Sequence, residues 1–287
     1  MPSNAPGALS ADPTVREALI LAAMAGLPAL EARMLLCHVT GLTRTQLITR
    51  DHQQLDAAQR DAFSTLLAKR LTGEPMAYLL GQREFFGRTF RVTPDVLIPR
   101  PDTEVAVEAS LARLADIHAP RVLDMGTGSG VLAVTIARER PDAEVWATDV
   151  SAGALTVAQD NARALQADNI RFLASDWYKA LPDNERFHLI VSNPPYIAES
   201  DPHLAEGDLR FEPIDALTDH DDGLSDLAQI VAGAPDHLLP GGWLLLEHGY
   251  DQGYATRHLL TTAGFFDVFT ARDLGSNERC SGGRRPH

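Results

Sequence analysis

A repeated succession of apolar run, turn and helix-compatible stretch occupies most of the chain after residue 120. The apolar runs are RVLDMG (121–126), EVWATDV (144–150), IRFLAS (170–175), FHLIVSN (187–193), GGWLLLEHG (241–249) and FFDVFTARD (265–273). Helix-compatible stretches lie between most of them, for example SGVLAVTIARER and SAGALTVAQDNARALQ. This alternation predicts an α/β fold with a parallel, doubly wound sheet. Ligands of such a sheet bind beyond the carboxyl ends of the strands, where the unusual residues of this chain fall.

The first part of the chain is typical of a small helical bundle. Two apolar-periodic stretches cover residues 14–27 and 28–41, and a third follows Asp56, which can cap it, and stops at Gly73. The third stretch places four apolar side chains on one stripe: Phe63, Leu66, Leu67 and Leu71. We therefore predict an N-terminal helical domain over residues 1–73.

The sequence pattern changes again over residues 74–95. Apolar and polar residues alternate there, with Gly81 and Gly87 as turn points, which predicts a β-hairpin linker. The strand-and-helix pattern then defines a second domain over residues 96–287.

The composition fits an ordinary cytoplasmic protein. No apolar run approaches the roughly 20 residues that cross a bilayer, and residues 1–14 lack the basic and apolar regions of a secretory signal. The two cysteines, Cys37 and Cys280, form no zinc-binding pattern and the ten histidines are scattered, so we expect no metal site.

The net charge of −14 argues against broad nucleic-acid binding, which depends on basic residues that neutralise phosphates. Residues 1–73 hold seven basic and six acidic residues, and the remainder holds 18 and 33. The acidic excess of the second domain suits either solubility or a basic protein partner.

The first strand-to-helix turn, DMGTGSG, contains Gly126, Gly128 and Gly130. Glycines there let the backbone approach a ligand and direct amides at the start of a helix toward it. A nucleotide site, a methyl-donor site and a merely tight turn share this feature.

Neighbouring acidic residues favour a cationic cofactor. Asp149 ends the second strand, where a carboxylate can accept both hydroxyls of a ribose. The G-x-G-x-G spacing differs from the dinucleotide pattern, and Asp124 precedes the turn, where an anion is unfavourable beside a pyrophosphate. S-adenosylmethionine, which carries an ammonium and a sulfonium, fits better and indicates a methyltransferase. After the third strand, Asp176 and Trp177 either border an adenine or serve as a helix cap and a core residue.

The fourth strand ends in Asn193-Pro194-Pro195-Tyr196. Proline fixes φ and has no N–H, so the turn is rigid and offers acceptors. Asn193 Oδ1 and the Pro194 carbonyl can accept both N–H bonds of a planar NH2 group, while Tyr196 packs on its face. Such bonds aim the poorly nucleophilic nitrogen of an amide at a methyl group. The alternative is an edge turn followed by a core tyrosine.

With these motifs placed, the chain resembles the protein-(glutamine-N5) methyltransferases that modify class I peptide-chain release factors. The resemblance covers nearly the whole chain and includes GEPMAYLLGQREFFGRTFRV, LIPRPDTE, DMGTGSG, SNPPYI, FEP, LLLEHG and DLGSNERCSGGR. It implies a Rossmann-like, class I methyltransferase fold behind a small helical domain. This domain either recognises the partner protein beyond the substrate tripeptide, because three residues cannot specify a target, or serves as a structural lid. Phe211 stands where the family commonly has Tyr, a minor departure.

The resemblance also implies residue roles. The cofactor-binding residues are Gly126, Thr127, Gly128, Ser129, Gly130, Asp149, Trp177 and Asn193. Asn193, Pro194, Pro195 and Tyr196 would hold the glutamine of a Gly-Gly-Gln motif, with Asn193, Pro194 and Tyr196 as the catalytic group. Arg100, Thr103 and Glu104 either close over the cofactor or serve only as the residues that start a helix, and Glu247 and His248 lie near the site without an assigned role.

Two alternatives remain open. A related enzyme methylates a glutamine of a ribosomal protein, and adenine-N6 methyltransferases share the Asn-Pro-Pro-Tyr chemistry because adenine also offers a planar NH2. The PRPDTE segment disfavours the first, and the negative charge without a basic recognition domain disfavours the second. We expect no stable nucleic acid partner and no membrane partner.

Overall fold

The computed structural model describes residues 12–287, so most of the lead expected at residues 1–14 lies outside the described residues. The chain divides into two compact units, one up to Gly81 and one from Gln82 to His287, and each is described by itself. No helix between residues 12 and 287 is both long and apolar enough to span a bilayer.

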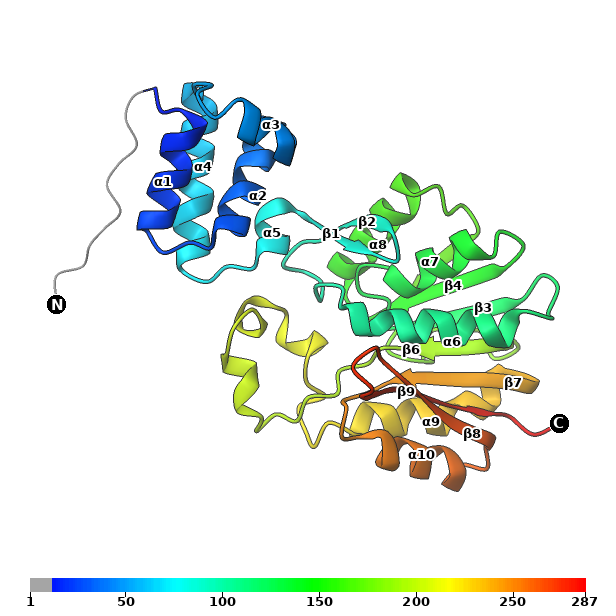
Figure 1. Cartoon of the computed structure of the whole chain (residues 1–287). Helices are drawn as coiled ribbons and strands as arrows, with labels where there is room; N and C mark the ends of the chain where they lie inside the picture. Colours follow the sequence, from blue (N-terminus) through cyan, green and yellow to red (C-terminus); the bar gives the residue numbers. More distant parts are fainter. Residues whose placement is uncertain (1–11) are drawn as a thin grey trace. The chain divides into compact units, whose positions relative to one another are not determined.

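The first unit consists of short helices around one apolar core (Figure 1). The helices are α1 (Val15–Met24), α2 (Ala29–Thr40), α3 (Arg44–Thr49), α4 (Ala57–Leu71) and α5 (Met76–Leu80). The three predicted helices are confirmed as α1, α2 and α4. The sequence pattern does not predict α3 and α5, because five or six residues are too few to show a helical stripe.

Local capping explains where α4 begins. The Asp56 carboxylate accepts from the Gln59 N–H (2.8 Å), and the Gln59 side chain accepts from the Asp56 N–H (3.2 Å), which forms a capping box. Within the predicted stripe, Phe63 and Leu67 are buried, whereas Leu71 is exposed.

The hairpin expected over residues 74–95 is shorter in the structure. Strands β1 (Gln82–Phe85) and β2 (Arg88–Arg91) pair antiparallel through a two-residue turn, in which Phe86 and Gly87 both have positive φ. Residues 76–80 form α5 instead, because left-handed Gly81 ends a helical turn there rather than a strand. The hairpin belongs to the second unit.

The second unit contains a seven-stranded sheet in the order β5-β4-β3-β6-β7-β9-β8 (Figure 1). Its strands are β3 (Arg121–Met125), β4 (Glu144–Asp149), β5 (Ile170–Ala174), β6 (Phe187–Ser192), β7 (Leu238–Glu247), β8 (Phe266–Arg272) and β9 (Glu278–Arg284). The strands from β5 to β7 pair in parallel. The chain leaves β3 toward β4 and later returns to β6 on the other side of β3, which creates the switch point where ligands of such sheets bind.

Strand β9 departs from the predicted parallel sheet. It lies between β7 and β8 and is antiparallel to both. Its centre, Ser-Gly-Gly, has low strand propensity, so the sequence pattern does not predict a strand there. Packing requires these glycines, because a Cβ on Gly282 would lie 2.7 Å from side-chain atoms of both Leu245 and Phe269.

Helices cover both faces of the sheet. These helices are α6 (Glu104–Leu114), α7 (Val131–Glu139), α8 (Ala152–Ala164), α9 (Ser225–His237) and α10 (Gly253–Thr262). Short 3₁₀ helices lie in the connecting segments: η1 (Pro101–Thr103), η2 (Pro202–Ala205), η3 (Leu209–Phe211) and η4 (Ile214–Ala216). Strand residues alternate between two cores: Val122 packs with residues of α6, α7 and α8, and Leu123 with residues of α9 and α10. The doubly wound α/β fold is therefore confirmed.

Candidate active site

The turn after β3 brings backbone to the wall of a cavity. Gly126, Gly128 and Gly130 have φ values of 69°, 55° and 84°, a region that L side chains rarely adopt. A Cβ on Gly130 would lie 3.1 Å from the Cβ of Ala158, so this glycine also lets α7 and α8 pack closely. A Cβ on Gly128 would meet no atom of the described chain within 4 Å, so this position faces open space.

Asp124 lies beneath this turn and does not line the cavity. Its Oδ2 accepts hydrogen bonds from the Thr127 hydroxyl (2.6 Å) and the Ala133 N–H (3.1 Å), and its Oδ1 has no partner among the described residues. Burial raises the pKa of this carboxyl to about 7. The expectation that Asp124 faces a cationic cofactor is therefore wrong, because its side chain points under the turn and holds the backbone in shape.

Asp149 ends β4, as the sequence predicts, and two backbone groups hold its carboxylate. Oδ2 accepts from the Gly128 N–H and Oδ1 from the Ser151 N–H, each at 2.9 Å. The residue is 9% exposed and lines the cavity, and burial raises the pKa of its carboxyl. Each oxygen keeps a further lone pair, with which it can accept a ligand hydroxyl.

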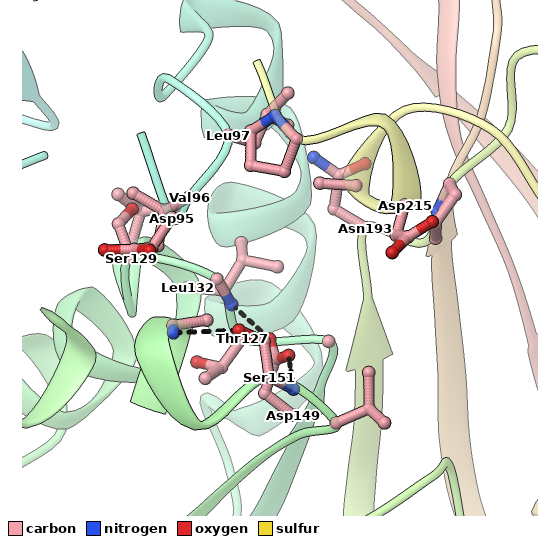
Figure 2. A pocket seen from close by; sticks show the side chains of 18 of the residues that line it. Asp95, Val96, Leu97, Thr127, Ser129, Leu132, Asp149, Ser151, Asn193 and Asp215 are labelled. Atoms are coloured by element: carbon pink, nitrogen blue, oxygen red, sulfur yellow. Dashed lines mark hydrogen bonds between the residues drawn. The ribbon is translucent and has the colours of Figure 1, made fainter. Parts of the chain in front are cut away.

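The cavity has a volume of about 600 Å³ and lies at the carboxyl ends of β3, β4, β5 and β6 (Figure 2). Figure 2 shows Asp149 and Ser151 in one part of the wall, with Asn193 and Asp215 in another. Apolar side chains that sequence patterns do not single out complete the wall: Val96, Leu97, Leu132 and Val150. Such a volume suits a small organic ligand.

The wall of this cavity is acidic. Among the described residues, its charged lining consists of Arg100 and five aspartates: Asp95, Asp149, Asp176, Asp215 and Asp226. Arg100 is paired with the buried Glu212 carboxylate, so its charge is already matched, and Asp176 is likewise paired with Lys179 (2.6 Å), so four aspartates make up the excess. The excess of carboxylates favours a ligand with positive charge and disfavours a pyrophosphate. The carboxylates that favour a cationic cofactor are therefore those of the cavity wall, and Asp124 is not among them.

Trp177 lines the cavity in a left-handed conformation with φ of 47°. The Ser175 hydroxyl donates to the Trp177 carbonyl (2.7 Å) and fixes this bend after β5. The ring lies close to Gly126, since a Cβ on that glycine would be 3.7 Å from it. Burial raises the pKa of Asp226, at the start of α9, and a hydrogen bond from Trp177 partly offsets the rise.

The Asn-Pro-Pro-Tyr segment follows β6 directly. Asn193 and Pro195 line the cavity with Thr127 and Ser129, and the Asn193 Nδ2 donates to the Thr103 hydroxyl at 3.4 Å. Pro194 and Tyr196 are not part of the cavity wall in the described structure. The segment therefore brings one side-chain amide, that of Asn193, to the cavity.

Tyr196 points its hydroxyl at a buried carboxyl. Its oxygen donates to Glu247 Oε1 at 3.4 Å, and Glu247 ends β7 with 1% exposure. Burial raises the pKa of Glu247 to about 7, and burial together with the Glu247 charge raises the pKa of Tyr196. The next residue, His248, is buried away from the cavity and hydrogen-bonds Ser281 (2.8 Å), which gives it a structural role.

The loop before α6 contributes two of its three expected residues to the cavity. Arg100 and Thr103 line it, and Arg100 pairs with Glu212, which also accepts from the Ile98 N–H (2.9 Å). Glu104 does not line it, because its Oε1 accepts from the Phe86 N–H (2.9 Å) and supports the hairpin turn. For Glu104 the structure therefore supports the second interpretation, because this residue is the first of α6 and does not line the cavity.

Comparison with known proteins supports a methyltransferase. The PrmC N-terminal domain model matches residues 17–81, and the methyltransferase small domain model matches residues 103–207. The release factor glutamine methyltransferase of Burkholderia pseudomallei is 59% identical over 91% of this chain and 93% of its own length. That of Bordetella pertussis is 58% identical over 90% and 95%. This chain belongs to the release factor glutamine methyltransferase family.

The fold of this family member is shared more widely. The Thermus thermophilus 16S rRNA N2 G1207 methyltransferase, solved in complex with AdoMet and guanosine, matches with a TM-score of 0.52 and 24% identity. The match covers 71% of this chain and 49% of that one.

S-adenosylmethionine is the cofactor of this methyltransferase. The acidic wall matches its positive charge, the Asp149 oxygens can accept its hydroxyls and the apolar wall can hold its base. Sequence patterns miss Asp215 and Asp226, because both come from loops and helix starts far from the motifs along the chain. Only the fold brings them to the cavity.

Proposed function

We propose that this chain transfers a methyl group from S-adenosylmethionine to N5 of the glutamine in the Gly-Gly-Gln motif of class I release factors, in the cytoplasm. The observation that carries the proposal is the position of Asn193. Its amide stands at the carboxyl end of β6 on the wall of the acidic cavity, directly before a rigid Pro-Pro pair. An amide oxygen held at this edge of the cavity can accept a hydrogen bond from the planar NH2 group of a substrate amide.

When bound, S-adenosylmethionine supplies an electrophilic methyl group on sulfur, and the carbon–sulfur electron pair stays with the sulfur as the methyl group leaves. In this proposal Asn193 Oδ1, on the cavity wall, and the Pro194 carbonyl, which does not line the cavity, accept the two N–H bonds of the substrate amide, and so direct its nitrogen lone pair toward the cofactor. Both acceptors also stabilise the positive charge that develops on that nitrogen. The methylated nitrogen then releases one proton to solvent.

The remaining proposed roles concern binding. The turn from Gly126 to Gly130, Asp149, Trp177 and Asn193 hold the cofactor, and Pro195 and Tyr196 support the substrate glutamine. Pro195 lines the cavity, whereas Tyr196 acts from behind it through its backbone and its bond to Glu247. The helical domain up to residue 73 recognises the release factor beyond the tripeptide, because three residues cannot specify a protein.

The direct test supplies purified release factor, a large-subunit ribosomal protein mixture and DNA with methyl-labelled S-adenosylmethionine. We expect label on the release factor only, and none when the Gly-Gly-Gln glutamine is replaced by alanine. Asn193→Ala should bring transfer to background while circular dichroism and the thermal midpoint stay near those of the wild type. Label on the ribosomal protein alone, or on DNA alone, would replace the proposal with one of those substrates.

A further inference from the structure

Gln252 joins three segments of the second unit, and the proposed reaction gives it no role. It stands directly before α10, and its side chain reaches the segment that follows β6. Its Nε2 donates to the Tyr196 carbonyl (2.9 Å) and to the Gly223 carbonyl (3.1 Å). Its Oε1 accepts from the Gly249 N–H (2.8 Å). One half-buried amide thus serves three backbone groups.

The three bonds admit a single orientation of this amide. The Tyr196 and Gly223 carbonyls can only accept, and the Gly249 N–H can only donate. A glutamine carries two N–H bonds on its nitrogen and lone pairs on its oxygen, so one orientation satisfies all three groups. An ionised glutamate of the same shape would still accept from Gly249, but it would place an oxygen against the two carbonyls.

Gly223 brings the two carbonyls close enough to share one NH2 group. Its φ of 83° lies in the left-handed region that favours glycine. A Cβ on this residue would lie 2.5 Å from the Tyr196 carbonyl oxygen and 2.9 Å from Gln252 Nε2. Any side chain there would therefore push these two residues apart. We call the meeting point of Tyr196, Gly223 and Gln252 the junction.

The junction closes the base of the loop between β6 and α9. This loop runs over residues 197–222, from the residue after Tyr196 to the residue before Gly223. Near its base the Ile197 N–H donates to the Leu217 carbonyl (3.0 Å). The loop contributes three residues to the cavity wall: Pro213, Asp215 and Ala216. Gln252 therefore fastens both ends of a loop that forms part of the site.

We propose that Gln252 is a positioning residue that holds the Asn-Pro-Pro-Tyr segment in the shape that receives the substrate amide. This inference rests on the proposed function. The two proposed acceptors, on Asn193 and Pro194, precede Tyr196 by three and two positions. The prolines keep the segment stiff, so a shift of Tyr196 is passed on to the acceptors. A displacement of about 1 Å at a reacting group can lower a rate about 100-fold.

The test compares Gln252→Glu with Gly223→Ala, which disturbs the same junction from its other side. In the first variant an oxygen faces the two carbonyls, and in the second a methyl group forces Tyr196 and Gln252 apart. We expect kcat for release factor methylation to fall on the order of 10- to 100-fold in each variant. The double variant should be no slower than the slower single variant, because both changes open one junction.

Binding of S-adenosylmethionine, measured by isothermal titration, should stay close to that of the wild type in both variants. The reason is that the middle of the loop is held separately. Glu212 pairs with Arg100 and accepts from the Ile98 N–H (2.9 Å). A fall in kcat without a matching loss of cofactor affinity separates positioning of the reacting groups from collapse of the cavity.

Asn169→Asp is the matched control. The Asn169 Nδ2 likewise donates to backbone carbonyls, those of Ala143 (2.9 Å) and Arg140 (3.3 Å), and the substitution again replaces a donating amide by a carboxylate. Asn169 directly precedes β5, at the end of the strand away from the cavity, and it is not part of the described cavity wall. Its thermal midpoint should fall as in Gln252→Glu, while its kcat should equal that of the wild type.

A measurement on the ligand-free protein completes the test. Hydrogen exchange, followed by mass spectrometry of peptic fragments, should be faster over residues 193–224 in Gln252→Glu and Gly223→Ala but not in Asn169→Asp. Unchanged exchange or wild-type kcat in both junction variants would overturn the inference. An equal fall of kcat in Asn169→Asp would also overturn it, since that indicates a general loss of stability. If the wild type labels no release factor, the proposed function fails and the inference falls with it; if the wild type labels it and both junction variants are as fast, only the inference fails.

Discussion

Asp149→Asn tests how the cofactor carboxylate is held. In the wild type both carboxylate oxygens already accept a backbone N–H, one from Gly128 and one from Ser151, each at 2.9 Å. Asparagine has the same shape but only one acceptor oxygen. The asparagine NH2 must therefore face the N–H of either Gly128 or Ser151, which loses its acceptor. For this reason the substitution is not conservative here.

The magnitude follows from these two bonds and from the ligand. One nearly buried donor without a partner costs about 1–3 kcal/mol of folding free energy. The loss of hydrogen bonds from ligand hydroxyls to a charged acceptor costs a further 1.5–3 kcal/mol in binding, by the same rule. A loss of about 3 kcal/mol in binding corresponds to a dissociation constant raised roughly 100-fold.

Isothermal titration with S-adenosylmethionine and urea denaturation measure the two effects separately. The matched control is Asp142→Asn, because Asp142 also accepts a backbone N–H, from Ala119 at 2.9 Å, but does not line the cavity within the described chain. Its binding should equal that of the wild type. Wild-type affinity in Asp149→Asn would show that no ligand hydroxyl bonds to this carboxylate and would refute the reasoning.

Three further outcomes can be measured by urea denaturation. Gly130→Ala should lower the free energy of unfolding by about 2–3 kcal/mol, because the cost of a positive φ adds to that of the 3.1 Å contact which its Cβ would make. Gly128→Ala should lower it by about 1 kcal/mol, because a Cβ there would meet open space. Equal losses in the two variants would contradict this prediction. Burial raises the pKa of Asp124 from 3.8 to about 7, so the folded state binds this proton more tightly than the unfolded state does. The free energy of unfolding should therefore fall as the pH rises from about 4 to 7, and Asp124→Asn should make this decline smaller. An unchanged decline in the variant would contradict the raised pKa. Arg100→Ala leaves the Glu212 carboxylate, whose side chain has 0% exposure, without its cation, and should lower the free energy of unfolding by about 3 kcal/mol. The double variant Arg100→Ala/Glu212→Gln should recover part of this loss. No recovery would show that the ion pair does not account for the loss.

Particular residues show how far sequence patterns reach. The prediction that Asp149 and Asn193 lie at strand ends is confirmed, because a buried strand followed by a loop has a local sequence pattern. The prediction that Asp124 faces a cationic cofactor is wrong, and Glu104 starts a helix instead of closing over the cofactor, although both residues stand in recognisable motifs. Each carboxylate serves a backbone N–H, of Ala133 and Phe86 respectively, and motif position does not reveal which way a side chain points.

The sequence by itself determined the strand-and-helix order, the glycine turn, the Asn-Pro-Pro-Tyr segment and the family, because these depend on neighbours along the chain. Only the tertiary structure decided that β9 inserts antiparallel between β7 and β8, that five aspartates from separate segments of the chain line one cavity, and that the Asn193 amide meets the Thr103 hydroxyl. These arrangements join residues that are far apart along the chain, 90 positions apart in the case of Thr103 and Asn193, and only the packing of the fold brings them together.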